Sequence, residues 1–116
     1  VEDIVERPWG TYQTILRGET YQVKRLVVYP GGQLSLQSHG HRSEHWIIVD
    51  GEGVATIGER RLEVAKDDSV YIPVGEKHRM SNFGEKNVVI IETQNGDYLG
   101  EDDIVRYEDI YGRLPI

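Results

Sequence analysis

The sequence predicts an all-β fold, a barrel or jelly roll built from short strands. About nine runs rich in β-branched and aromatic residues lie along the 116-residue chain. Turn sequences such as Asp50-Gly51 and Gly58-Glu59-Arg60 separate these runs. Two segments, Gly31–Gly51 and Pro73–Asn82, carry side chains that can ligate a metal, and a barrel can bring such segments together. We expect a single domain over residues 1–116, because a chain of this length has no room for a second core.

The first half of the chain should contribute four strands. The runs are rich in Tyr, Val, Ile and Thr, and Pro30-Gly31-Gly32 ends the second of them. The fourth run leads into Asp50-Gly51, which has the sequence of a tight hairpin turn. In order, the expected strands are Thr11–Leu16, Tyr21–Tyr29, Gln33–His39 and His45–Val49.

The second half should add five strands and one helical segment. The strands are Gly53–Ile57, Arg61–Val64, Ser69–Ile72, Lys77–Asn82 and Val88–Thr93. After Gly100, three acidic residues precede Ile104-Val105. Acidic side chains are favourable at the positive N-terminal end of a helix, so we expect a short C-terminal helix there.

Composition excludes several classes of function. The net charge of −7 argues against a nucleic-acid partner, because phosphate contacts need a basic face. The chain has no cysteine, which excludes thiolate metal sites and cysteine nucleophiles and fits a cytoplasmic protein. Apolar runs such as Val88–Ile91 are too short to cross a bilayer, and the acidic start is unlike a signal peptide. We expect no membrane partner.

Residues that can ligate a metal recur in two distant segments. Along Gln33–His39 the side chains of a strand alternate between two faces. Polar residues share one face, and Leu34 and Leu36 share the other. A second segment offers a histidine after a stiff Pro73-x-Gly75 turn. We expect one divalent cation inside the barrel, held by Gln37, His39, Glu44 and His78.

These residues resemble the two motifs of the cupin superfamily. The first motif is matched by Gly31, Gln37, His39, Glu44 and Gly51, and the second by Pro73, Gly75, His78 and Asn82. Gln37 stands where cupins usually have a first histidine, and Asp67 stands where the second motif usually opens with glycine. The resemblance implies a cupin double-stranded β-helix, a jelly-roll barrel, around the four-ligand site. His41 is the alternative ligand beside His39.

Longer motifs resemble the type II mannose-6-phosphate isomerase domain over nearly the whole chain. They are Arg7-Pro8-Trp9-Gly10-x-Tyr12, Leu34–Gln37, His41–Trp46, Ser69–Pro73, Gly100–Arg106 and Tyr111-Gly112-Arg113. Such a domain is often the C-terminal part of a bifunctional mannose-1-phosphate guanylyltransferase, which implies GDP-mannose biosynthesis. Zinc is the first expected metal, with manganese, cobalt and nickel as alternatives. Gly40 departs from the pattern, since many relatives have a third histidine there.

Basic residues are candidates for binding a substrate phosphate, because guanidinium groups pair well with phosphate oxygens. The candidates are Arg42, Lys77, Arg79, Arg106 and Arg113. We assign Arg42, Lys77 and Arg113 to substrate binding and Arg106 to the catalytic group. Glu101 is the expected general base, and His41 is next in line.

The predicted function is that of a metal-dependent aldose–ketose isomerase. It would interconvert mannose 6-phosphate and fructose 6-phosphate through an enediol. The alternative is a non-catalytic sugar-phosphate-binding or regulatory cupin. A metal-dependent oxygenase is a third class, which Gln37 as an additional ligand makes less attractive.

Apolar residues outside a small barrel predict a homodimer. Leu34 and Leu36 are expected on the face opposite the ligands, and Tyr21–Tyr29 adds outward valines. Such surfaces are commonly buried against a second copy across a two-fold axis.

Overall fold

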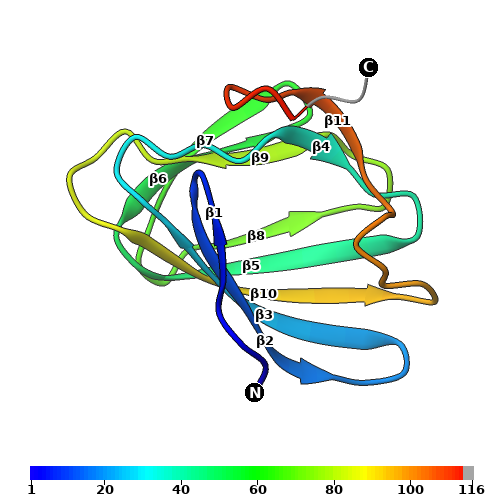
Figure 1. Ribbon diagram of the computed structural model, residues 1–116. Coiled ribbons are helices and arrows are strands. Elements are labelled where there is room, and N and C mark those ends of the chain that lie inside the picture. The colour runs from blue at the N-terminus through cyan, green and yellow to red at the C-terminus, as the bar shows by residue number, and fades with distance from the viewer. Residues whose placement is uncertain (114–116) are drawn as a thin grey trace.

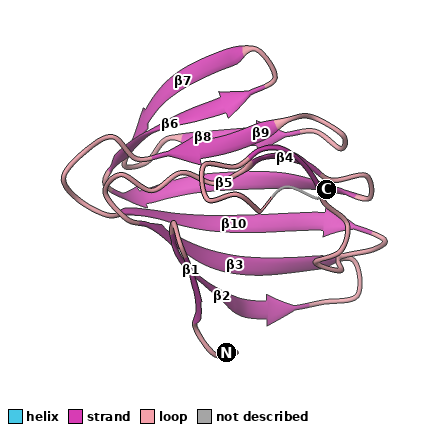
Figure 2. Cartoon of the chain, turned by 45° about the horizontal axis from the view of Figure 1, so that its top comes forward, coloured by secondary structure: helices cyan, strands magenta, loops and turns pink. Residues whose placement is uncertain are grey.

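The computed structural model describes residues 1–113, which form eleven strands and no helix (Figure 2). The all-β prediction is confirmed. No helix in this range is long and apolar enough to span a membrane. The strands are β1 (Val5–Arg7), β2 (Gly10–Arg17), β3 (Tyr21–Val28), β4 (Leu36–Ser38), β5 (Arg42–Asp50), β6 (Glu52–Ile57), β7 (Arg60–Ala65), β8 (Ser69–Ile72), β9 (His78–Ser81), β10 (Val88–Gly96) and β11 (Val105–Glu108).

The strands pair into two antiparallel sheets. The first has the order β1-β2-β3-β10-β5-β8, and the second has the order β11-β4-β9-β6-β7. Figure 1 shows β3, β10 and β5 of the first sheet facing β4, β9 and β6 of the second. Neighbours far apart in sequence, such as β3 and β10, pair over eight residues each. Non-local pairing of this kind brings the two ligand segments to one place.

The interior changes from apolar to polar along the central strands. At one end, inward side chains of both sheets form the apolar core, which includes Trp9, Leu26, Val28, Leu34, Trp46, Ile48, Ala55, Ile57, Met80, Val88 and Ile90. At the other end, Lys24 lies opposite Glu92, and Gln94 lies opposite both Gln22 and Glu44. These polar side chains are also buried. A buried polar group without a partner costs about 1–3 kcal/mol, so this end of the barrel requires partners.

The predicted C-terminal helix is wrong. Glu101 and Asp102 form a turn, and Val105–Glu108 is the edge strand β11, paired with β4. The Asp103 carboxylate accepts hydrogen bonds from the backbone N–H groups of Gly40 and His41, at 2.9 Å each. The acidic residue therefore satisfies the backbone of a different segment, and pairing with β4 outweighs the local helix signal.

The run Gln33–His39 is also more irregular than a single strand. Only Leu36–Ser38 forms β4, and Gln33 makes an isolated bridge with Ser81. Leu34 belongs to the buried core and is 7% exposed, so its predicted place on the face away from the ligands is wrong. The reason is that the break in the strand interrupts the two-residue alternation. Two valines of the Tyr21–Tyr29 run, Val27 and Val28, are buried as well. The homodimer stays a prediction that no longer draws on Leu34 or on these valines.

Candidate metal centre and basic cavity

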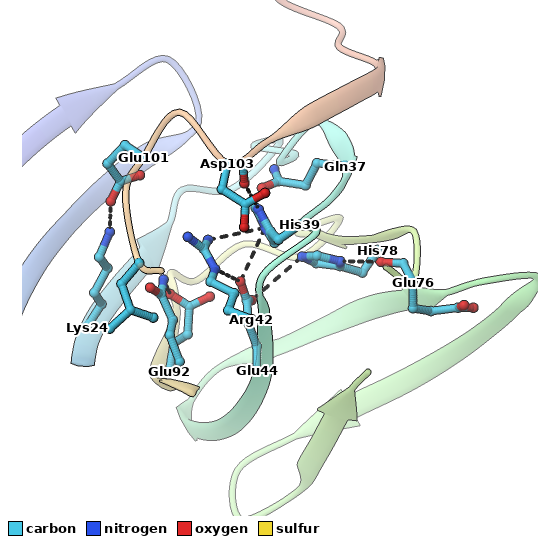
Figure 3. A network of polar contacts seen from close by, with 12 residues as sticks. Lys24, Gln37, His39, Arg42, Glu44, Glu76, His78, Glu92, Glu101 and Asp103 are labelled. Atoms are coloured by element: carbon cyan, nitrogen blue, oxygen red, sulfur yellow. Dashed lines mark hydrogen bonds and ion pairs between the residues drawn. The ribbon is translucent and has the colours of Figure 1, made fainter. Parts of the chain in front are cut away.

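Three predicted ligands converge inside the polar end of the barrel (Figure 3). His39 follows β4, Glu44 lies on β5 and His78 begins β9. One ligand atom of each lies within 4.8 Å of the other two, and all three residues are buried. Nε2 of His39 is 3.2 Å from Glu44 Oε2, and Nε2 of His78 is 3.6 Å from Glu44 Oε1. We refer to these three residues as the triad.

Each histidine of the triad is oriented by a backbone carbonyl. Nδ1 of His39 lies 2.7 Å from the Asp103 carbonyl oxygen, and Nδ1 of His78 lies 2.9 Å from that of Glu76. A carbonyl only accepts, so both Nδ1 atoms carry the proton and donate. Each Nε2 atom therefore carries a lone pair, and both atoms lie beside the Glu44 carboxylate. Carbonyl partners hold metal-binding histidines in this way.

The electrostatics of the triad fit a divalent metal. Burial, followed by the charge of Arg42, lowers the pKa of His39 to about 4. Burial also lowers the pKa of His78. Both imidazoles are therefore neutral near pH 7. Neutral imidazoles offer lone pairs to a metal, and two imidazoles with one carboxylate are a common donor set for a divalent cation.

Arg42 contacts the triad directly. Its Nε donates to Glu44 Oε2 at 3.0 Å, and its Nη2 lies 3.2 Å from Nε2 of His39. Its Nη1 is buried and has no hydrogen-bond partner among the described residues. We predicted Arg42 as a phosphate ligand. The structure shows a buried guanidinium that contacts Glu44 and also lines the neighbouring cavity, so the phosphate role stays a prediction.

Glu92 is a functional candidate that the sequence analysis missed. Trp46 Nε1 donates to Glu44 Oε1 at 3.1 Å and to Glu92 Oε1 at 3.0 Å, which places the two carboxylates side by side. Burial, and next the charge of Glu44, raise the pKa of Glu92 to about 7. The sequence did contain a signal for this residue: Glu92 follows Val88 and Ile90 at two-residue spacing, which places its side chain on the same inward face of the strand.

A cavity of about 230 Å³ lies next to the triad. Arg42, which contacts Glu44 and His39, also lines this cavity. It is lined by Arg7, Trp9, Tyr12, Lys24, Leu26, Leu34, Ser35, Gln37, Arg42, Glu92, Gln94, Glu101, Ile104, Arg106 and Arg113. Five of these residues are basic and two are acidic. The cavity therefore favours an anionic ligand, although the chain as a whole carries a net charge of −7. We call it the basic cavity.

The structure gathers some predicted site residues at the basic cavity. Gln37 lines it, in register with His78, and its amide nitrogen donates to Ser35 Oγ at 2.8 Å. Figure 3 places the Gln37 side chain beside His39. Arg106 and Arg113 line it as well, and Arg113 pairs with Asp109 at 2.7 Å.

Other predicted residues do not line this cavity. His41 is exposed, with its ring edge-on to Tyr98 at 5.9 Å between centroids. The Lys77 ammonium lies 4.3 Å from the centre of the Tyr107 ring. Arg79, a candidate in the sequence analysis, donates to the Glu108 carbonyl at 3.3 Å. Their spacing in sequence gave no information on which side of the sheets they would face.

Glu101 forms an ion pair with Lys24, a residue that the sequence analysis did not single out. Lys24 faces the interior in phase with Leu26 and Val28, so it had the same signal as Glu92, a charged residue on an apolar face. Its burial at 3% exposure requires a counter-charge.

Metal-free protein should show a pH-dependent effect of replacing Glu92 with glutamine. Because the pKa of Glu92 is about 7 when folded and 4.5 ordinarily, wild-type stability falls as pH rises through that window. His39 has the opposite effect, because its lowered pKa makes the protein less stable as pH falls from 6.5 to about 4. This effect is the same in wild type and in E92Q, so it cancels in the comparison. Urea unfolding in a chelator should show E92Q gaining on the order of 2 kcal/mol over wild type between pH 4 and pH 8. A difference that does not change with pH would contradict the buried, proton-binding Glu92.

Comparison with known families decides what kind of domain this is. Residues 1–109 match the family described as mannose-6-phosphate isomerase C-terminal. The chain belongs to this family. The resemblance seen in the sequence motifs is thereby confirmed.

Relatives of this isomerase-type domain are much longer proteins. It is 54% identical over 109 residues to the xanthan biosynthesis protein XanB of Xanthomonas campestris pv. campestris. It is 49% identical over 109 residues to the alginate biosynthesis protein AlgA of Pseudomonas aeruginosa. It is 54% identical over 110 residues to a mannose-1-phosphate guanylyltransferase of Salmonella montevideo. Each match covers 94% of this chain and 23% of the relative, so the chain spans about a quarter of their length.

Solved structures show that the fold is a cupin double-stranded β-helix, as expected. The capsular polysaccharide assembling protein CapF from Staphylococcus aureus aligns with a TM-score of 0.81 and 22% identity, covering 91% of this chain and 34% of that one. A cupin-2 domain from Rhodospirillum rubrum aligns with a TM-score of 0.75 and 23% identity, covering 87% of this chain and 77% of that one.

Proposed function

We propose that the chain is a metal-dependent isomerase that interconverts mannose 6-phosphate and fructose 6-phosphate through an enediol. The observation that carries this proposal is the junction of a buried triad with a basic cavity, joined through Arg42. An aldose–ketose isomerase needs an electrophile at the carbonyl, an acid–base group beside it and a cationic site for the phosphate. The membership of the chain in the isomerase family supports the choice of sugar.

His39, Glu44 and His78 are the residues that would hold the metal, with Gln37 as the fourth predicted ligand. Bound there, a divalent cation would polarise the sugar carbonyl and favour loss of the neighbouring carbon-bound proton. Zinc is our first choice, with manganese, cobalt and nickel as alternatives, because nitrogen and carboxylate donors suit all four.

The chain's own residues would position the sugar and move the proton. The reacting carbons would lie at the wall shared by the triad and the cavity, where the buried Nη1 of Arg42 can donate to a sugar oxygen. Glu92 lines the same wall, and its pKa of about 7 suits a group that takes a proton from one carbon and returns it to the next. We assign Glu92 as the general base, in place of the predicted Glu101.

The competing function is a non-catalytic sugar-phosphate-binding domain. The same basic cavity would serve it, but such a domain has no use for two buried carboxylates beside paired imidazoles. Burying those groups costs stability that binding alone does not require.

A coupled assay for fructose 6-phosphate separates the two functions. Chelator-treated protein should be inactive with mannose 6-phosphate, and turnover should return on adding back one of the four metals. Each metal should be tested with the same protein preparation. If every metal-loaded form binds mannose 6-phosphate and forms no fructose 6-phosphate, the binding-domain reading replaces the isomerase.

A further inference from the structure

The basic cavity contains a lysine whose role the proposed reaction leaves open. Lys24 lies on β3 with its side chain directed inward and is 3% exposed. Its Nζ is 4.7 Å from the centre of the Tyr12 ring and contacts the Glu101 carboxylate. Figure 3 shows this contact on the same side of the triad as Arg42 and Glu92, and all four residues line the basic cavity. A buried ammonium needs an anion, and this one is supplied from a loop 77 residues away in sequence.

The two members of this ion pair lie in very different surroundings. The Lys24 side chain is 4% exposed, whereas that of Glu101 is 60% exposed. An exposed carboxylate loses little by returning to water, since ion pairs of solvent-exposed groups contribute only about 0–1 kcal/mol. Lys24 is different, because its buried ammonium would lack a counter-charge if Glu101 moved away and no other anion took its place. The glutamate is therefore the replaceable partner.

The loop that carries Glu101 is held on both sides of it. The Leu99 carbonyl accepts a hydrogen bond from Gln22 Nε2 at 3.3 Å, and the Asp103 carboxylate accepts two from Gly40 and His41. The side chain of Glu101 can thus leave Lys24 while the backbone stays in place.

Two guanidinium groups of the same cavity have nitrogens with no partner. Nη1 of Arg42 and Nε of Arg106 are buried and make no hydrogen bond to the described residues. Unsatisfied cationic donors in one small cavity call for a ligand with several acceptor oxygens. A phosphorylated sugar has this chemistry, because its sugar oxygens can meet Arg42 and its phosphate oxygens can meet Arg106 and Lys24. One carboxylate from Glu101 does not satisfy all three donor groups.

We infer that Lys24 binds the phosphate of the substrate and that Glu101 is an internal anion that competes with this phosphate for the lysine. The inference rests on the proposed function for the identity of the phosphosugar. It makes Lys24 the residue that selects a phosphorylated sugar, and it gives Glu101 a role other than proton transfer.

Binding measurements on chelator-treated protein test the inference without turnover. Titration calorimetry with inorganic phosphate and with mannose 6-phosphate would compare wild type, Lys24→Met and Glu101→Gln. Lys24→Met keeps the length of the side chain and removes its charge, so both affinities should fall about tenfold or more. Glu101→Gln removes the competing anion, so both affinities should rise roughly fivefold. Lys86→Met is the matched control, because Lys86 is exposed and lies outside the cavity.

The opposite signs of the two variants make the result decisive. Unchanged affinity in Lys24→Met, or weaker phosphate binding in Glu101→Gln, would overturn the inference. Glu101 is exposed on a loop, so its variant remains informative if Lys24→Met does not fold, as judged by circular dichroism. Isomerase turnover with an unchanged KM in Lys24→Met would overturn the lysine's role and leave the proposed function standing. Phosphate binding that needs Lys24, in a protein without any turnover, would overturn only the isomerase.

Discussion

Isomerase turnover should fall by about a thousandfold or more when His78 is replaced by alanine. His78 is 2% exposed, and its Nε2 faces the Glu44 carboxylate across 3.6 Å. Removing one of the three donors of the triad weakens metal binding, and with it the polarisation of the sugar carbonyl. Metal content by elemental analysis and turnover by the coupled assay should fall together.

The control for this variant is His45→Ala. His45 lies on β5, as Glu44 does, but it is exposed on the outer face with its ring 4.8 Å from that of Tyr71. This change should leave metal content and turnover unchanged. Glu44→Gln, which keeps the size of the side chain, guards against a folding defect in His78→Ala and should also lose metal. Full activity of His78→Ala without bound metal would refute the metal centre.

The second large effect is expected at Glu92. Glu92→Gln preserves the hydrogen bond from Trp46 and removes the group that accepts a proton, so kcat should fall by about 10²–10⁴-fold. The KM for mannose 6-phosphate should change little, because the variant leaves in place Lys24 and Arg106, the groups proposed to hold the phosphate. Steady-state kinetics over a range of mannose 6-phosphate concentrations would measure both constants.

Glu101→Gln is the matched comparison, since it makes the same chemical change in the same cavity. It should retain kcat, because Glu101 is engaged with Lys24 and not with the triad. The reverse outcome, with loss of kcat in Glu101→Gln and retention in Glu92→Gln, would return the general base to the residue predicted from sequence.

Much of the fold could be predicted because strand and turn signals are local. Ser69–Ile72 forms β8 with the predicted bounds, and Asp50-Gly51 joins β5 to β6. Gly51 has φ +80°, a conformation that glycine adopts without strain, which explains why this dipeptide marks the turn. The strand Val105–Glu108 was missed because it pairs with β4, which lies far away in sequence, and because the acidic residues before it resemble a helix start.

By itself, the sequence predicted most of the strands along the chain and singled out His39, Glu44 and His78, which the structure brings together. Residue spacing and turn chemistry are properties of short segments, and a motif can be identified from such short segments alone. Only the tertiary structure decided the surroundings of the triad: Arg42 against Glu44, and Lys24 with Glu101. Both contacts depend on which face of a sheet is buried in the barrel and on which distant loop covers that face. Charge and burial act through space, so a lysine on β3 and a glutamate 77 residues later become partners only after the barrel has closed.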